Sequence, residues 1–252
     1  MTKPKILLYD IETAPRLGYV WGEYEQNMLK VVKNSYILCF SYKWFGKKAV
    51  KVVSLPDFKL YKREPENDRE VVKALWSLFD EADYLIGHNS DSYDNRWAAK
   101  QFVYHSMKPP SPNVWIDTKK IAKKYLRCDS NSLDKLGEFL GVGRKVKHNG
   151  LDMWFDCMDG DMKAWRTMIR YARGDVDLLE RVYLKLRPYH TSHPNVNALP
   201  GTLDACPKCG STDIIARGSI PTNTGRKRRW SCNDCGGWSV GKVKQTKGME
   251  IR

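Results

Sequence analysis

The stretch KILLYDIETAP, residues 5–15, joins an apolar run directly to two acids, Asp10 and Glu12, and ends at Pro15. Residues two apart in an extended strand point to the same face, so both carboxylates should project together from the end of a buried strand. Two adjacent carboxylates repel each other and are ionised near neutral pH unless they are buried. A divalent cation would resolve this conflict. The alternative is that the strand simply ends here and both acids face solvent.

The remaining elements follow from composition and periodicity. Four further segments are rich in β-branched and aromatic residues and are predicted strands: residues 35–45, 49–55, 82–89 and 113–117. Three segments repeat apolar residues at helical spacing: residues 67–82, 118–126 and 132–141. A long helix is predicted from Asp161, a good N-cap, to Pro188, although Gly174 within it costs about 1 kcal/mol relative to Ala and indicates a local need for a small residue. This order predicts an α/β layer fold with an antiparallel meander at its start.

The charge of the whole chain indicates its class of partner. The 252 residues are 42% hydrophobic, enough for one sizeable core and a small appendage. Lys and Arg outnumber Asp and Glu by 43 to 29, and the net charge of +14 favours a polyanion such as nucleic acid, the alternative being a generically basic surface. The apolar run at the N-terminus is too short for a signal peptide, and no segment approaches about 20 apolar residues, so we expect a cytoplasmic protein without a membrane partner.

Two other segments contain polar side chains where a site could form. LIGHNSDSYD, which follows a predicted strand, holds His88, Asn89 and Asp94, and loops at strand ends are where α/β folds build their sites. In YARGD, Tyr171 and Asp175 are four residues apart and share one face of the long helix, beside its apolar stripe. Taken singly, the polar residues of the first segment can simply cap a helix. Tyr171 and Asp175 can simply lie at the border of the buried face and be hydrogen-bonded to water. An acid at the border of a buried face nevertheless needs a partner.

The three segments together resemble a known family. DIE in the first strand, HNxxxYD after the fourth and YxxxD in the last helix resemble the three exonuclease motifs of the DEDD superfamily, which comprises ribonuclease-H-like proofreading and RNA-trimming exonucleases. The similarity covers residues 4 to about 187 and is of the phage and bacterial type. It implies four metal-binding acids: Asp10, Glu12, Asp94 and Asp175. Tyr171 matches the tyrosine (DEDDy) subgroup, because the position of the histidine in the sister subgroup holds Arg170 here.

This resemblance implies a mixed five-stranded sheet flanked by helices, two Mg²⁺ or Mn²⁺ ions, and hydrolysis of phosphodiester bonds at nucleic-acid 3′ ends, with DNA favoured over RNA. Two ions about 3.5 to 4 Å apart can activate water and stabilise a leaving alkoxide, and oxygen ligands suit them. Tyr171 would position the attacking water, whereas Thr13 and Asn89 would contact substrate. His88 is expected to be a packed or surface histidine and not a catalyst. The alternatives are an RNA-trimming exoribonuclease and a non-catalytic nucleic-acid-binding protein on a nuclease fold.

The C-terminal part of the chain contains paired cysteines. CPKCG and CNDCG frame 22 residues and are predicted to bind one structural Zn²⁺ through four thiolates: Cys206, Cys209, Cys232 and Cys235. The segment resembles a zinc ribbon. We therefore predict an exonuclease domain at residues 1–187, a linker at 188–203 and a zinc ribbon at 204–252.

The same part of the chain is strongly basic. Residues 201–252 hold 10 Lys or Arg against 4 Asp or Glu. A run of four basic residues and a tryptophan is a candidate for phosphate contacts and base stacking: Arg226, Lys227, Arg228, Arg229 and Trp230. The alternative is a solvated hairpin tip. The ribbon would then hold the substrate or a partner protein, for which a replication or repair protein is the candidate.

Overall fold

The computed structural model of the chain describes residues 3–24, 27–199, 201 and 204–245. Its strands are β1 (Ile6–Thr13), β2 (Leu17–Tyr19), β3 (Lys30–Lys33), β4 (Ile37–Trp44), β5 (Lys51–Ser54), β6 (Tyr84–Gly87), β7 (Val114–Asp117), β8 (Ile214–Thr222), β9 (Gly225–Cys232) and β10 (Trp238–Gln245). Its helices are α1 (Arg69–Glu81), α2 (Asp94–Tyr104), α3 (Thr118–Tyr125), α4 (Leu133–Phe139), α5 (Asp152–Met158) and α6 (Met162–Leu186). Three 3₁₀ turns are η1 (Leu55–Asp57), η2 (Lys59–Lys62) and η3 (Arg187–Tyr189).

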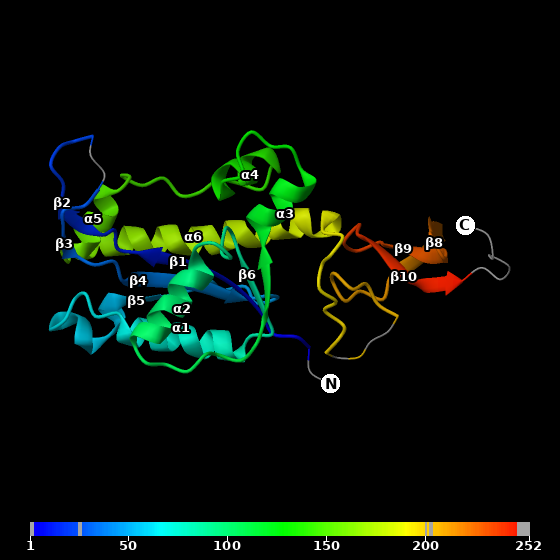
Figure 1. Cartoon of the computed structure of the whole chain (residues 1–252), viewed down its shortest axis with the longest axis horizontal. Coiled ribbons are helices and arrows are strands. Elements are labelled where there is room, and N and C mark those ends of the chain that lie inside the picture. Colours follow the sequence, from blue (N-terminus) through cyan, green and yellow to red (C-terminus); the bar gives the residue numbers. More distant parts are fainter. Residues whose placement is uncertain (1–2, 25–26, 200, 202–203, 246–252) are drawn as a thin grey trace.

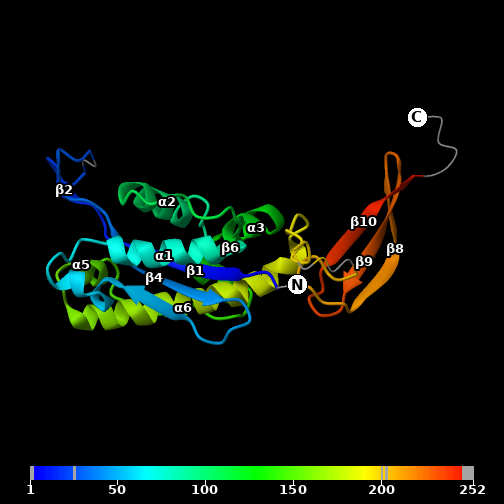
Figure 2. The same ribbon diagram turned by 90° about the horizontal axis from the view of Figure 1, so that it is seen from below.

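A mixed five-stranded sheet forms the centre of the larger domain. Its order is β5-β4-β1-β6-β7, in which β1 pairs antiparallel with β4 and parallel with β6. Helices α1 and α2 cover one face of the sheet, and α6 runs along the other (Figure 2). This confirms the predicted α/β fold, including the antiparallel meander formed by β1, β4 and β5. The acids of the opening motif therefore lie on the central strand.

The two long helices form where the sequence predicts them. Helix α1 buries Val71, Leu75 and Phe79 against the sheet, as its spacing requires. Helix α6 begins directly after Asp161, whose side chain accepts a hydrogen bond from the Lys163 N–H at 2.7 Å. Most of its predicted core stripe is buried, from Trp165 to Leu186, which fixes the rotation of the helix on the sheet.

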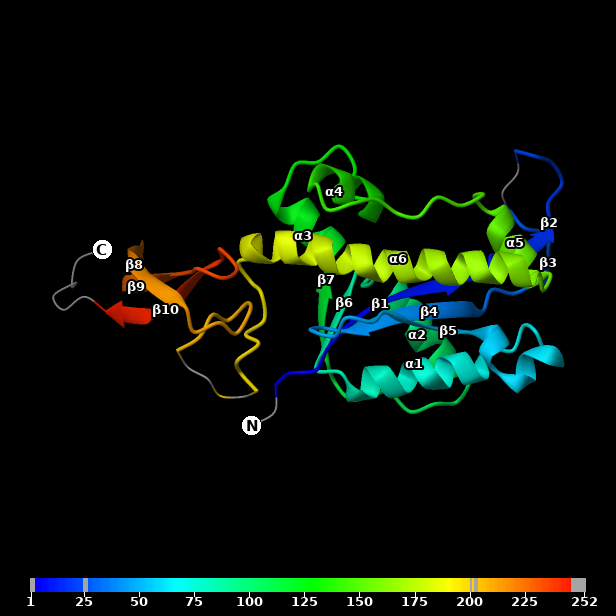
Figure 3. The ribbon, with the colours of Figure 1, turned by 180° about the vertical axis from the view of Figure 1, so that it is seen from behind.

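Two elements of the larger domain have no counterpart among the predicted ones: the β2–β3 hairpin and the short helix α5. Both lie at the end of the domain toward which β1 runs, and the C-terminal strands lie at the opposite end (Figures 1 and 3). The hairpin is largely exposed on both faces, so it lacks the alternation of apolar and polar residues that marks a half-buried strand. Helix α5 has seven residues, too few to show a clear helical period.

The C-terminal module, defined here as residues 204–245, is a three-stranded antiparallel sheet in the order β10-β9-β8. The residues predicted as a linker make specific contacts: Tyr183 and His193 are hydrogen-bonded at 2.8 Å between Oη and Nε2, and Lys208 donates to the Pro188 carbonyl. The module is thus tied to the end of α6. Among the described residues, no helix is long and apolar enough to cross a membrane.

Candidate active site

Three of the predicted acids meet between the central strand and the long helix. Asp10 and Glu12 point to the same side of β1, and Asp175 faces them from the middle of α6. One carboxylate oxygen from each of the three lies within 4.8 Å of the others. Asp175 is fully buried, and the described residues offer its Oδ1 no hydrogen-bond partner. Acidic oxygens are thus concentrated at one point with too few donors to satisfy them.

Asp94 approaches this cluster from the opposite side of β1. Strand β6 pairs with β1 only as far as Leu8, so the N–H of Ile11 has no partner on that side of the sheet. The Asp94 carboxylate, at the first residue of α2, accepts a hydrogen bond from this N–H at 3.0 Å. Its oxygens lie outside the group formed by Asp10, Glu12 and Asp175. The fourth acid is therefore near the cluster but separately anchored.

Lys145 completes the cluster, although it is not among the residues predicted from the sequence. Its Nζ donates a hydrogen bond to the Tyr171 hydroxyl at 2.7 Å and lies 2.7 Å from Asp175 Oδ2 as an ion pair. Burial, the largest single influence, would lower the pKa of Lys145, but Asp175, Tyr171 and Asp10 together outweigh it and raise the pKa above its usual value. The ammonium group is thus charged and supplies the positive partner that a buried Asp175 requires.

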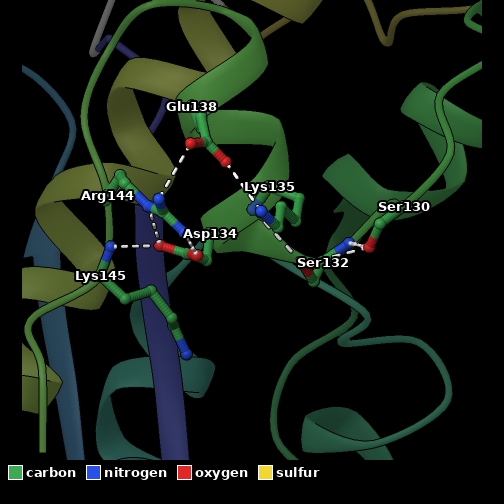
Figure 4. A network of polar contacts seen from close by, with 7 residues as sticks. All are labelled: Ser130, Ser132, Asp134, Lys135, Glu138, Arg144 and Lys145. Carbon is green, nitrogen blue, oxygen red and sulfur yellow. Dashed lines mark hydrogen bonds and ion pairs between the residues drawn. The ribbon is translucent and has the colours of Figure 1, made fainter.

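The backbone of Lys145 is fixed by a polar network on helix α4. The Arg144 guanidinium bonds both oxygens of Asp134, at 2.7 and 3.3 Å, and also reaches Glu138 at 2.9 Å. The N–H of Lys145 donates to Asp134 at 2.9 Å, and its side chain points away from this network (Figure 4). The loop thereby holds the ammonium in one direction, which favours a defined role in the site.

Gly174 provides the space for this loop. A Cβ atom at Gly174 would lie 2.9 Å from Val146 Cγ2, closer than side-chain atoms normally approach. Val146 directly follows Lys145, so the helix must present no side chain at this position. This accounts for a glycine that costs the helix about 1 kcal/mol relative to Ala.

We expect Gly174→Ala to lower activity by displacing the loop that carries Lys145. In a Val146→Ala background the clash is removed, and the same substitution should instead stabilise the protein by up to about 1 kcal/mol through helix propensity. Thermal unfolding and turnover of the two single variants and the double variant test this. If the effects of the two substitutions on activity and melting temperature were simply additive, residue 174 and Val146 would not be in contact.

The Tyr171 ring is enclosed by aromatic side chains that the sequence did not single out. His148 and Trp154 pack edge-on against it, with ring centroids 4.7 and 5.8 Å away. Burial, followed by the charges of Glu12 and Asp175, raises the pKa of Tyr171 well above its usual value. The phenol therefore keeps its proton at neutral pH and can donate it in a hydrogen bond.

Crowding of the acids changes their protonation. Burial is the main cause that raises the pKa of Glu12 to about 8, with the charge of Asp175 as the next contribution. Burial also raises the pKa of Asp94 to about 7. The pKa of Asp10 lies well above its usual value, mainly through burial and then through Asp94 and Glu12. One ammonium does not balance this set of carboxylates.

These residues fit a divalent metal site. The donors are hard carboxylate oxygens, which Mg²⁺ and Mn²⁺ prefer. Oδ1 of the fully buried Asp175 has no hydrogen-bond partner among the described residues, while Oδ2 is paired with Lys145 at 2.7 Å. A divalent cation would offset both causes of the raised pKa values, because it replaces the hydration lost on burial and relieves the repulsion between the acids.

The raised pKa values predict how stability depends on pH without metal. Between pH 5 and 8 the folded acids bind more protons than the unfolded chain, whose carboxyl pKa values are near 4, so stability should fall as pH rises. We expect the melting temperature in chelator to drop by several degrees over this range. Added Mg²⁺ should raise it more at pH 8 than at pH 6, because binding requires deprotonated acids. Glu12→Gln should flatten the profile, and an equally steep profile in that variant would contradict the assignment.

Two of the predicted substrate contacts, Thr13 and Asn89, lie in the same chain segments as acids of the site. Thr13 Oγ1 is 2.7 Å from the hydroxyl of Tyr93, a half-exposed residue that directly precedes Asp94. Asn89 adopts a left-handed conformation, and its N–H donates to Asp117 at 2.9 Å. His88 is packed between Thr118 and the Asn131 carbonyl, as expected, and burial lowers its pKa to about 4.

The four cysteines also converge. Their sulfur atoms all lie within 4.8 Å of one another, and the pairs Cys206–Cys235 and Cys209–Cys232 are each 3.7 Å apart. A tetrahedron with metal–sulfur bonds of about 2.3 Å has edges of about 3.8 Å. The cluster is thus compatible with the predicted zinc ribbon.

The basic run of the module lies in strand β9 and not in a turn. Because successive residues of a strand point to opposite faces, Arg226 and Arg228 share a face with Trp230. Lys227 and Arg229 lie on the other face. The Arg228 guanidinium stands over the Trp230 ring at 5.1 Å. A ligand on one face of the sheet would meet two of the four basic residues.

Comparison with known proteins places this geometry in a family. The sequence profile described as RNase_H superfamily matches residues 24–187, well over half of the chain. The chain belongs to the RNase_H superfamily.

The family B DNA polymerase from the hyperthermophilic archaeon Pyrobaculum calidifontis has a similar structure, with a TM-score of 0.53 and 13% sequence identity over 88% of this chain. The alignment spans only 32% of the polymerase chain, so the likeness concerns the fold. No curated protein sequence matches the chain. Asp10 and Glu12 thus sit on the central strand of an RNase H-like fold, and Asp94 and Asp175 come from helices α2 and α6.

Proposed function

We propose that the protein is a two-metal-ion 3′–5′ exonuclease of the DEDDy subgroup that hydrolyses phosphodiester bonds at nucleic-acid 3′ ends, with DNA as the favoured substrate. The observation that carries this proposal is the convergence of Asp10, Glu12 and Asp175 within 4.8 Å, with Oδ1 of Asp175 left without a hydrogen-bond partner among the described residues. Asp94 and Tyr171 add the remaining members of the motif set. Polarity and sugar preference rest on the resemblance of the three motifs.

Each residue has a distinct task in this proposal. Asp10, Glu12, Asp94 and Asp175 would hold the ions, which supply an activated water and neutralise the charge on the leaving oxygen. Tyr171 keeps its proton and is placed to orient the attacking water through its hydroxyl. Lys145, already charged beside Tyr171 and Asp175, is placed to stabilise negative charge on the phosphate.

An end-labelled cleavage assay tests the proposal. Single-stranded DNA, duplex DNA and RNA, each labelled at the 5′ end, are incubated with Mg²⁺, Mn²⁺ or chelator. Stepwise shortening that requires the divalent ion is the expected result, and DNA should be shortened faster than RNA. Internal cuts, or release of the labelled 5′ nucleotide first, would refute the proposed polarity. Faster shortening of RNA would support the exoribonuclease alternative.

Tyr171→Phe is expected to lower the single-turnover rate by about 10²-fold, since a positioning role lies toward the low end of acid–base effects. Substrate affinity should stay nearly unchanged, because the hydroxyl is not assigned to binding. Tyr183→Phe is the matched control, since Tyr183 is buried on the same helix but bonds His193. An unchanged rate in Tyr171→Phe would remove this residue from the chemistry.

The C-terminal module is proposed to bind zinc and to contact either the nucleic acid or a protein partner such as a replication or repair protein. Asp175 lies 11 residues before the end of α6, or about 17 Å along the helix, and the module begins beyond that point. The basic face with Arg226, Arg228 and Trp230 can therefore reach only nucleic acid that extends well away from the cleaved bond.

A further inference from the structure

The β2–β3 hairpin presents aromatic side chains that the larger domain does not use. Trp21 is 82% exposed, Tyr24 is 94% exposed and Tyr19 is 63% exposed. Aliphatic residues of the same hairpin, including Leu29 and Val32, are also more than half exposed. Contiguous exposed apolar surface on a soluble protein marks an interaction site.

The hairpin is a direct continuation of the strand that carries the acids. β1 pairs with β4 up to Thr13, and the N–H of Ala14 donates to the Tyr36 carbonyl at 2.9 Å. After Pro15 the same two chain segments pair again, as Leu17 opposite Lys33. The hairpin therefore follows directly from the strand that carries Asp10 and Glu12, and it lies at the end of the domain where β1 stops (Figure 3).

Basic side chains flank these rings at the two ends of the hairpin. Arg16 and Lys30 are exposed, and neither has an ion-pair partner among the described residues, whereas Lys33 is paired with Glu66 at 3.0 Å. An acid, Glu23, lies exposed between Trp21 and Tyr24, so the rings carry the argument and the charge only supports it. Aromatic rings bind single-stranded nucleic acid by stacking on its bases, and cations beside the path of the strand follow the phosphates.

We propose that the β2–β3 hairpin is a stacking platform for the single strand whose 3′ end enters the acidic site, with bases upstream of the cleaved bond stacked on Trp21 and Tyr24. This rests on the proposed nuclease function and specifies how the substrate is held. Eight residues separate Thr13 from Trp21, so the rings lie at most about 26 Å from the end of β1. At about 3.4 Å per stacked nucleotide, they can meet bases up to about seven nucleotides upstream.

Substrate length gives the decisive test. Single-stranded DNA of 2 to 12 nucleotides is cleaved by the wild type, by the Trp21→Ala/Tyr24→Ala double variant and by Phe139→Ala, which removes an exposed ring from α4. The double variant should lose roughly 10- to 100-fold in kcat/KM on the 12-mer and nothing on the dinucleotide. Phe139→Ala should match the wild type at every length. Equal losses on dinucleotide and 12-mer, or no loss on either, would overturn the platform.

A binding measurement separates this inference from the proposed activity. Fluorescence anisotropy of labelled 12-mer DNA in chelator requires no cleavage, and the double variant should bind at least about tenfold more weakly than the wild type. If the wild type cleaves nothing yet this difference is present, the proposed activity fails and the platform stands. If DNA binding is unchanged and the double variant instead loses self-association in gel filtration, the hairpin is a protein interface and the platform is refuted.

Discussion

Replacing Asp175 by Asn is expected to lower divalent-dependent hydrolysis by on the order of 10³-fold or more while the protein stays folded. Metal assistance contributes several kcal/mol to the barrier, and each 1.36 kcal/mol corresponds to a factor of about ten. Asp175 is fully buried and is the one acid that α6 contributes to the group with Asp10 and Glu12, so no other carboxylate of that helix replaces its charge there. Asparagine keeps the shape of the side chain, and the loss would therefore report charge and metal binding.

The same helix offers a matched control for this experiment. Asp177 is two residues further on, is about half exposed and pairs with Arg181. Asp177→Asn removes an equal charge and should leave turnover unchanged. In chelator at pH 8, Asp175→Asn should still unfold cooperatively with only a small change in melting temperature, because loss of the ion pair with Lys145 is offset by relief of the repulsion among the acids. Wild-type rates in Asp175→Asn, purified free of host nucleases, would refute the site.

The sequence reveals elements whose two faces differ in burial. Strand β1 and helices α1 and α6 each have an apolar face against the core, and this difference produces the periodicity from which they are predicted. The β2–β3 hairpin and strand β9 have exposed side chains on both faces, so neither shows the period. Their pairing depends on the strands beside them, which a local pattern does not contain.

The residues of the candidate site also differ in whether the sequence reveals them. The sequence points to Asp10, Glu12 and Asp175 because their charge conflicts with apolar surroundings, and to the full set with Asp94 through the resemblance of the three motifs. Lys145 could not be predicted, since it lies in a loop without periodicity, 30 residues before Asp175. The position of Lys145 is set by two hydrogen bonds to Asp134 on helix α4, one from the Arg144 side chain and one from the N–H of Lys145 itself.

Two local features nevertheless pointed toward this loop. An acid at the border of a buried face requires a partner, and Lys145 is that partner. Gly174 indicates that something packs closely against α6, and Val146 is the group that does so. Such an unexplained small residue beside a predicted acid is a useful signal for a missing member of a site.

Cys206→Ser is expected to unfold the C-terminal module and leave the larger domain intact. Structural zinc contributes about 10 to 16 kcal/mol to small zinc-binding folds, and the described part of the module has almost no apolar core besides Ala205 and the cysteines. The bound zinc should fall from about one per chain to near zero by elemental analysis. Trypsin should then cut within Arg226–Arg229. In the folded module these residues are protected because strand β9 is paired with β8 on one side and with β10 on the other.

Cleavage and binding should respond differently to this substitution, because the acids lie in the larger domain and the cysteines in the C-terminal module. The Cys206→Ser protein should still shorten short oligonucleotides in a divalent-dependent reaction, because the acids lie in the other domain. It should bind long single strands more weakly if the basic face of β9 contacts nucleic acid, and normally if the module contacts a protein. Cys128→Ser, which changes a lone cysteine outside the cluster, controls for loss of a thiol. A variant that retains zinc and resists trypsin would refute the four-thiolate site, since three remaining sulfurs cannot close the tetrahedron that holds the strands together.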